Sequence, residues 1–180
     1  EALESNDLPK SVLIVGGGAT GCEFAYLYNA YGVEVTIVEL LPHLLPNEDE
    51  EVSQQLERAF RKQGITVLTD TKVTEMTAGT KTAKVTMEGP DGSTTSEYQR
   101  LLVAVGVQAN IEGLELEKVG VGTEKGFIAV DDHMLTSVQT ISAIGDVTGL
   151  MLLAHVATAQ GVAVAEWQAG QDSPTIDLKT

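Results

Sequence analysis

A glycine-rich turn between a short aliphatic run and a helical pattern constrains this chain more than any other feature. Residues 11–15, SVLIV, are typical of a strand buried on both faces of a parallel sheet. Gly16, Gly18 and Gly21 follow directly in the pattern G-x-G-x-x-G. In this setting Gly16 permits a tight turn, Gly18 lets the backbone approach a pyrophosphate, and Gly21 lets the helix pack closely on the sheet. The N-terminus of that helix would then offer free N–H groups and a partial positive charge to phosphates.

An acidic residue stands where a dinucleotide-binding chain needs one. The run Val33–Glu39, VEVTIVE, predicts a second strand that ends in a carboxylate. Glu39 can accept hydrogen bonds from adenosine ribose hydroxyls, and its charge would repel the 2′-phosphate of NADP. No Arg or Lys follows it until Arg58, so the pattern favours NAD over NADP. These residues alone leave open an S-adenosylmethionine-dependent methyltransferase, which also uses glycines and an acid after the second strand.

The order of the predicted elements indicates an α/β fold with a Rossmann-type parallel sheet and an antiparallel β-meander as crossover. Helices are expected before Gly32 and from Glu51 to Gly64, the second one capped by Asn47 or Asp49. The remaining predicted strands are residues 65–68, a meander over 71–98 with a turn at 89–92, 101–105, 127–130 and 140–144, followed by a helix over 152–169.

The charge and cysteine content narrow the possible partners. Of the 180 residues, 26 are acidic and 11 basic, giving a net charge of −15. Such a surface disfavours nucleic acid and anionic membranes, because both are bound by clustered Lys and Arg. The single cysteine, Cys22, excludes an internal disulfide and a Cys-only metal site, and fits a reducing, cytoplasmic location. From the residues alone Cys22 is a small core residue without chemistry.

Taken together, the ordered motifs are more specific than any one of them. GGGATGCE, VTIVE, LLVAVG, TISAIGD and LLAH occur in this order between Leu8 and Gly170. The set resembles the pyridine-nucleotide disulfide oxidoreductases and, among them, is most similar to the dihydrolipoyl dehydrogenases. The resemblance implies an oxidoreductase that uses NAD and FAD, the protein supplying orientation and electrostatics to these cofactors.

The resemblance also assigns site residues. It places the NAD site on Gly16, Gly17, Gly18, Ala19, Thr20, Gly21, Cys22, Glu23, Glu39, Val73 and Gly106, and flavin contacts on Gly145, Asp146, Leu152, Leu153, Ala154 and His155. The residues themselves give Asp146 only modest support, from its place after a predicted strand. His155 is not assigned as a catalytic base, because the base of the family lies in a different domain.

Several features of the family are not present in this sequence. They are a separate N-terminal FAD-binding glycine motif, a redox-active CxxxxC pair and a C-terminal interface domain with a His-Glu pair. Gln108 also stands where the family often has an arginine. We therefore expect an NAD-binding domain over 1–131 and an incomplete FAD-domain segment over 132–180 whose apolar residues lack a cover.

These features lead to one functional expectation and one alternative. The chain is expected to be the NAD(H)-binding portion of a dihydrolipoyl dehydrogenase-like enzyme and to be inactive alone. The full-length parent would be a homodimer and a candidate component of a 2-oxo acid dehydrogenase complex. The alternative is a stand-alone NADH-binding module or one subunit of a split enzyme. No metal site is expected.

Overall fold

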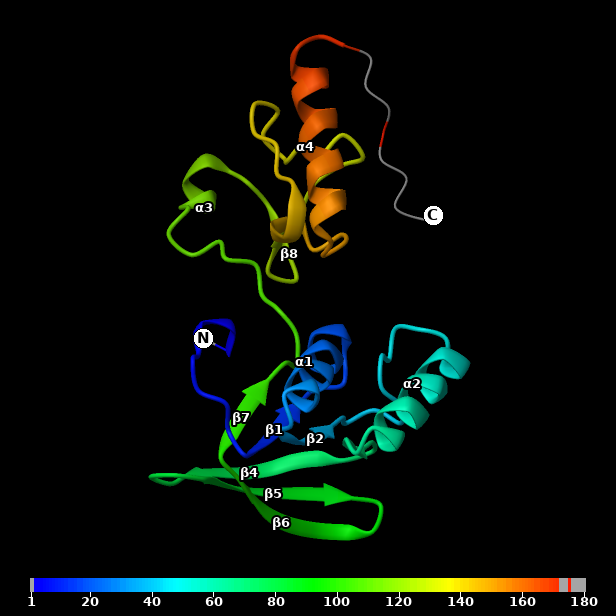
Figure 1. Ribbon diagram of the computed structural model, residues 1–180. Helices are drawn as coiled ribbons and strands as arrows, with labels where there is room; N and C mark the ends of the chain where they lie inside the picture. The colour runs from blue at the N-terminus through cyan, green and yellow to red at the C-terminus, as the bar shows by residue number, and fades with distance from the viewer. Residues whose placement is uncertain (1, 172–174, 176–180) are drawn as a thin grey trace. The chain divides into compact units, whose positions relative to one another are not determined.

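The computed structural model describes residues 2–171 and 175, and the chain divides into two compact units (Figure 1). The first unit is Glu1–Gly106 and the second is Val107–Thr180. The predicted division at residue 131 concerns which cofactor each part binds, and it stays a prediction.

A parallel sheet forms the centre of the first unit. Its strands are β1 (Ser11–Val15), β2 (Glu34–Val38), β3 (Thr66–Leu68) and β7 (Arg100–Val103), in the order β3-β2-β1-β7. Each neighbouring pair is parallel. The predicted α/β class and Rossmann-type sheet are therefore confirmed, and because parallel strands share one carboxyl edge, the turns after β1, β2 and β7 meet there.

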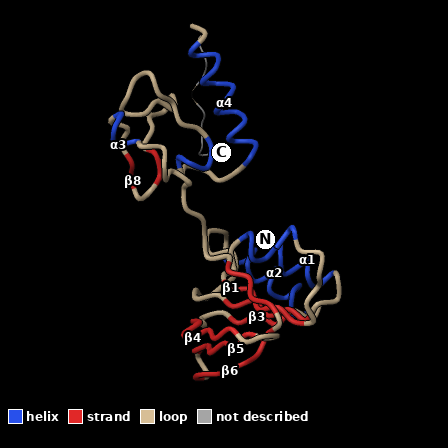
Figure 2. The backbone as a smooth tube through the Cα atoms, turned by 90° about the vertical axis from the view of Figure 1, so that its left-hand side faces the viewer, coloured by secondary structure: helices blue, strands red, loops and turns tan. Residues whose placement is uncertain are grey.

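Two helices cover one face of this sheet. They are α1 (Ala19–Ala30) and α2 (Glu50–Lys62), and Figure 2 shows them on the same side of the strands. Val12 and Ile14 of β1 point to this face and share a buried cluster with Phe60 of α2. Of the two candidate caps for α2, Asp49 is the one used, since its side chain accepts a hydrogen bond from the Glu51 amide at 2.8 Å.

An antiparallel meander covers the opposite face of the parallel sheet. It consists of β4 (Lys72–Ala78), β5 (Ala83–Gly89) and β6 (Gly92–Tyr98), joined between β5 and β6 by the predicted turn. Val85 and Met87 of β5 are buried against Leu13 of β1, which alternates with the helix-facing residues of that strand. The first unit thus has three layers, with the parallel sheet in the middle and the predicted crossover in place (Figure 1).

The second unit is small and has little regular sheet. Its elements are α3 (Leu116–Val119), β8 (Thr123–Glu124), β9 (Phe127–Ile128), the 3₁₀ turn η2 (Gly145–Thr148) and α4 (Ala154–Gln168). The buried apolar cluster of this unit is built on Val121, Ile128 and Ala143. None of the helices in the described part of the chain is long and apolar enough to cross a membrane.

The predicted strand over residues 140–144 is wrong. Only one isolated antiparallel bridge forms in that region, between Leu135 and Ser142. The backbone turns back on itself, with the Thr136 amide donating to the Ile141 carbonyl at 3.0 Å. Local composition favoured a strand, but an extended strand needs a partner along its length, and within the described residues this segment pairs only with its own preceding turn.

Apolar side chains remain exposed in the second unit. Along α4 only Gln160 is fully buried, and Val162 is 53% exposed. Leu150, Leu152 and Leu153, just before this helix, are all more than two-fifths exposed. We expect that apolar residues of this segment are covered by a part of the longer protein that the sequence does not include. That expectation stays a prediction.

Candidate functional site

The three motif glycines of the first turn each have a different geometric role. Gly16 has a φ of +109°, and a Cβ atom there would lie 2.4 Å from the carbonyl oxygen of Ala104. A Cβ atom at Gly21 would lie 1.9 Å from the carbonyl oxygen of Gly16. At Gly18 it would meet nothing within 4 Å. Gly16 and Gly21 are thus required by the fold itself, whereas Gly18 borders open space, as a position approached by a ligand must.

The N-terminus of α1 lies at this open space. Gly18 is the N-cap, and no side chain caps the helix there. Ala19 and Thr20, the first two helical residues, are exposed. The first amides of a helix lack partners within the helix and attract anions. The turn therefore has the geometry and the polarity that a pyrophosphate needs, and the NAD site over these residues stays a prediction.

Glu39 lies directly after β2 at the same edge and is 9% exposed. Its Oε2 accepts a hydrogen bond from the Gly17 amide at 2.5 Å, and its Oε1 accepts one from the Leu41 amide at 2.9 Å. A carboxylate has about four acceptor positions, so two remain for ribose hydroxyls. The backbone donors of the chain itself thus hold the carboxylate in place.

The remaining residues predicted for this site divide into two groups. Gly106 follows β7 with a φ of +134°, and a Cβ atom there would meet nothing within 4 Å. Since β7 pairs with β1, its turn opens at the same edge as Gly18. Val73 is half-buried in the cluster between the sheet and the meander, so it packs the core there. Its contact with a ligand stays a prediction, as does that of the exposed Glu23 on α1.

Cys22 supports the turn from inside the core. Its thiol donates to the Gly17 carbonyl oxygen at 3.3 Å, and the residue is 6% exposed. Burial, followed by the negative charges of Glu39, Glu23 and Glu57, raises the pKa of the thiol to about 12. The thiolate that redox or nucleophilic chemistry requires is therefore suppressed, in agreement with the prediction of a core cysteine.

This burial predicts a specific pH dependence. The thiol of Cys22 has its ordinary pKa of 9.0 in the unfolded chain and a pKa of about 12 in the folded one. The contribution of the neutral thiol to the free energy of unfolding is therefore complete below pH 9.0 and is lost as the pH rises from 9.0 to about 12. We expect the thiol to react with iodoacetamide in urea and not in buffer. The loss of stability above pH 9.0 should be smaller in C22A than in wild type. Equal labelling of the folded and unfolded chain would contradict this account.

The residues predicted to contact flavin lie in the second unit. Gly145 is buried with a φ of +73°, and its amide donates to Gln160 Oε1 at 2.6 Å. Asp146 is exposed and makes no hydrogen bond through its carboxylate with the described residues. Gln160, which the sequence analysis did not assign to the site, has its Nε2 buried without a partner in the described structure. Leu152, Leu153, Ala154 and His155 are exposed around the start of α4. A loop aspartate with free acceptors fits a ribityl hydroxyl, and the flavin contacts stay a prediction.

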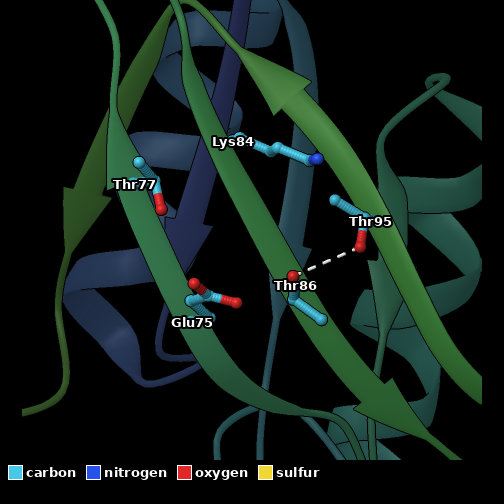
Figure 3. Close-up of a pocket in the computed structure, with 5 residues that line it drawn as sticks. All are labelled: Glu75, Thr77, Lys84, Thr86 and Thr95. Carbon is cyan, nitrogen blue, oxygen red and sulfur yellow. Dashed lines mark hydrogen bonds between the residues drawn. The ribbon is translucent and has the colours of Figure 1, made fainter.

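A shallow hollow of about 470 Å³ lies elsewhere, on the outer face of the meander (Figure 3). Its walls are Glu75 and Thr77 of β4, Lys84 and Thr86 of β5, and Thr95 of β6. Lys84 and Thr86 alternate with the buried Val85 and Met87, so the hollow faces away from the parallel sheet. Thr86 and Thr95 hydrogen-bond to each other at 3.2 Å. The hollow has neither a glycine that borders open space nor a helix N-terminus among its walls. The glycine turn is therefore the better candidate site.

Sequence reasoning missed the loop that supports the turn. Leu44 is fully buried although it lies between β2 and α2 in a stretch without regular structure. A Cβ atom at Gly17 would lie 2.6 Å from Leu44 Cδ2 and 3.1 Å from Glu39 Oε2. The one signal in the sequence was Gly17, which occupies a position where the G-x-G-x-x-G motif accepts any residue. A glycine at such a position indicates that another group packs closely against it.

Comparison with known proteins identifies the family. The family model described as pyridine nucleotide-disulphide oxidoreductase matches residues 1–161. The chain belongs to this family. Membership in the pyridine nucleotide-disulphide oxidoreductases removes the methyltransferase alternative and agrees with the resemblance drawn from the ordered motifs.

Relatives within the family are dihydrolipoyl dehydrogenases. Those of Mycobacterium bovis and Mycobacterium tuberculosis are 48% identical over 177 residues, which is 98% of this chain and 38% of each relative. That of Zymomonas mobilis is 44% identical over 95% of this chain and 37% of its own length. The chain thus spans a little over a third of the curated relatives that it matches.

Solved structures show the same fold. The crystal structure of LpdA from Mycobacterium tuberculosis matches with a TM-score of 0.88 and 34% identity, covering 98% of this chain and 38% of that one. The HOCl-induced flavoprotein disulfide reductase RclA from Escherichia coli matches with a TM-score of 0.88 and 26% identity, covering 97% and 39%. The chain is therefore a portion of a flavoprotein disulfide oxidoreductase.

Proposed function

We propose that this chain is the NAD(H)-binding portion of a dihydrolipoyl dehydrogenase. One observation carries the proposal. A buried carboxylate, Glu39, is fixed at the carboxyl edge of the sheet beside a glycine turn whose Gly18 opens onto free space. This pair supplies the two recognition elements of NAD, a donor-rich seat for the pyrophosphate and an acceptor for the ribose.

The residues of the site would bind and orient the dinucleotide. The α1 amides would hold the pyrophosphate, Glu39 would accept from the adenosine ribose, and the open backbone at Gly106 would border the rest of the cofactor. Bound NAD⁺ supplies a hydride acceptor. Selection against NADP follows from charge, because the 2′-phosphate would meet a buried carboxylate and no cation nearby in sequence.

The role in the parent enzyme follows from the relatives. They are named dihydrolipoyl dehydrogenases, which implies dihydrolipoamide oxidation, with Gly145, Asp146 and the residues before α4 contributing to the flavin site. A cytoplasmic homodimer that serves a 2-oxo acid dehydrogenase complex is part of the same proposal. The chain alone is expected to show no lipoamide-dependent NADH turnover, since catalysis would need a redox disulfide and it has one cysteine.

The decisive experiment is titration of the purified chain with NADH and, separately, NADPH, followed by nicotinamide fluorescence. We expect binding of NADH and at least about tenfold weaker binding of NADPH, a difference of about 1.4 kcal/mol. Equal binding of the two would refute the role given to Glu39. Binding of neither by a chain that circular dichroism shows to be folded would refute the proposed function.

A further inference from the structure

The loop between β2 and α2 is packed onto the glycine turn. The Leu45 amide donates to the Gly17 carbonyl oxygen at 2.7 Å. The Leu44 side chain is 0% exposed, and its Cδ2 lies 2.6 Å from the position that a Cβ atom at Gly17 would take. Since Gly17 also donates to Glu39, the loop and the carboxylate hold the same residue from two sides. The shape of the turn therefore depends on where this loop lies.

A buried carboxylate on α2 holds the loop in turn. Glu57 Oε1 accepts from the Leu44 amide at 3.1 Å, and the residue is 9% exposed. Its Oε2 accepts from Arg61 Nη1 at 3.1 Å, one helical turn further along. Ser53 makes a weaker contact from the same helix, donating to the Leu45 carbonyl at 3.5 Å. A charged group is seldom buried without a specific partner, and here the partners are the Leu44 amide and one arginine.

We propose that Glu57 is a positioning residue of the dinucleotide site. It fixes Leu44, the next residue fixes Gly17, and Gly17 binds the carboxylate of Glu39. Glu57 makes no hydrogen bond to the glycine turn itself, so its structural link to the turn runs through the loop. This inference rests on the proposed function, because it assigns the loop a role in NAD binding and not in folding alone.

The simpler alternative is that Glu57 only joins a helix to a loop. The two hypotheses differ in which property changes when the contact is lost. A purely structural contact alters the free energy of unfolding and leaves the affinity of the folded chain unchanged. A positioning contact weakens NADH binding by the chain that remains folded, and a conservative variant that keeps the acceptor restores it.

The test compares four variants of the chain by NADH fluorescence titration and urea unfolding. E57A removes the acceptor, and we expect the Kd for NADH to rise about tenfold, since a buried amide is left without a partner and the loop shifts. E57Q keeps an oxygen for the Leu44 amide and should stay within about threefold of wild type. R61A removes only the exposed ion-pair partner of Glu57, and the Kd for NADH should change little. E51A, an exposed glutamate on the same helix, is the matched control.

The outcomes separate this inference from the proposed function. If wild type binds NADH and E57A binds it as tightly as E51A does, Glu57 is not a positioning residue. If folded wild type does not bind NADH, the proposed function fails and the inference fails with it. Should E57A not fold, E57D serves instead, because its shorter carboxylate keeps the charge but does not reach the Leu44 amide. If the Leu44 amide exchanges faster in E57D than in wild type while the NADH affinity stays equal to wild type, the inference is also overturned.

Discussion

Substitution of Gly21 by alanine is expected to destabilise the first unit by about 3 kcal/mol or more, despite improving the helix propensity of the residue. Alanine is favoured over glycine inside a helix by about 1 kcal/mol. The added methyl, however, would lie 1.9 Å from the Gly16 carbonyl oxygen, which is backbone and has no rotamer to change. Relief requires α1 to move away from β1, and because α1 supplies Cys22 and Ala25 to the main core, the loss of packing exceeds the gain in propensity.

The matched control for this prediction lies three residues away. G18A adds the same methyl into open space, so its unfolding free energy should fall by no more than about 1 kcal/mol, the usual cost of alanine at an N-cap. Its NADH affinity should fall, because the methyl would occupy the space that the pyrophosphate needs. The measurement is urea unfolding followed by circular dichroism. If G21A unfolds at the same urea concentration as G18A, the close approach of α1 to the turn is not what requires glycine.

Substitution of Glu39 by glutamine is expected to have the largest effect on cofactor binding. The two oxygens of Glu39 accept from the Gly17 and Leu41 amides, whereas glutamine offers one oxygen and an NH₂ group. The NH₂ would face an amide, donor against donor, which costs about 1–3 kcal/mol in a buried site. NADH affinity should fall about tenfold to a hundredfold, and discrimination against NADPH should largely disappear because the repelling charge is gone.

Titration of E39Q with both nucleotides, beside urea unfolding, checks this prediction. E34Q is the control, since Glu34 begins the same strand and is exposed. The E34Q substitution also removes one negative charge, from the start of β2, and leaves the glycine turn unchanged. Retention of full NADH selectivity by E39Q would show that specificity resides elsewhere. A similar loss in E34Q would point to net charge and not to position.

Local patterns in the sequence predicted the features that neighbouring residues determine. Gly16 and Gly21 were assigned to a tight turn and a close helix, and backbone oxygens lie too near both positions for a Cβ atom, at 2.4 Å and 1.9 Å. The meander predicted over residues 71–98 was placed correctly, and Val85 and Met87 of its middle strand β5 are buried because successive residues of a strand face opposite sides. The cap of α2 was narrowed to two residues and proved to be Asp49.

The features that were missed depend on contacts distant in sequence. Leu44 belongs to the site through Gly17, and Glu57 belongs to it through Leu44, so neither has a signature of its own within a short window. The predicted strand at 140–144 failed for a related reason, since a run of suitable residues does not form a strand without a partner. The motif predicts contacts only for its own residues. Contacts of other residues with a ligand depend on how the folded chain brings distant segments together.

In the proposed function, the uncapped start of α1 is the feature by which this acidic chain would receive an anion. At −15 the protein repels a dinucleotide at long range, while the helix amides attract it only within the first turn. Ionic strength acts unequally on these two forces. The Debye length falls to about 8 Å at physiological salt, which screens the distant charges far more than the contact itself. Added salt should therefore speed the encounter between nucleotide and protein, the reverse of the behaviour of a basic cofactor site.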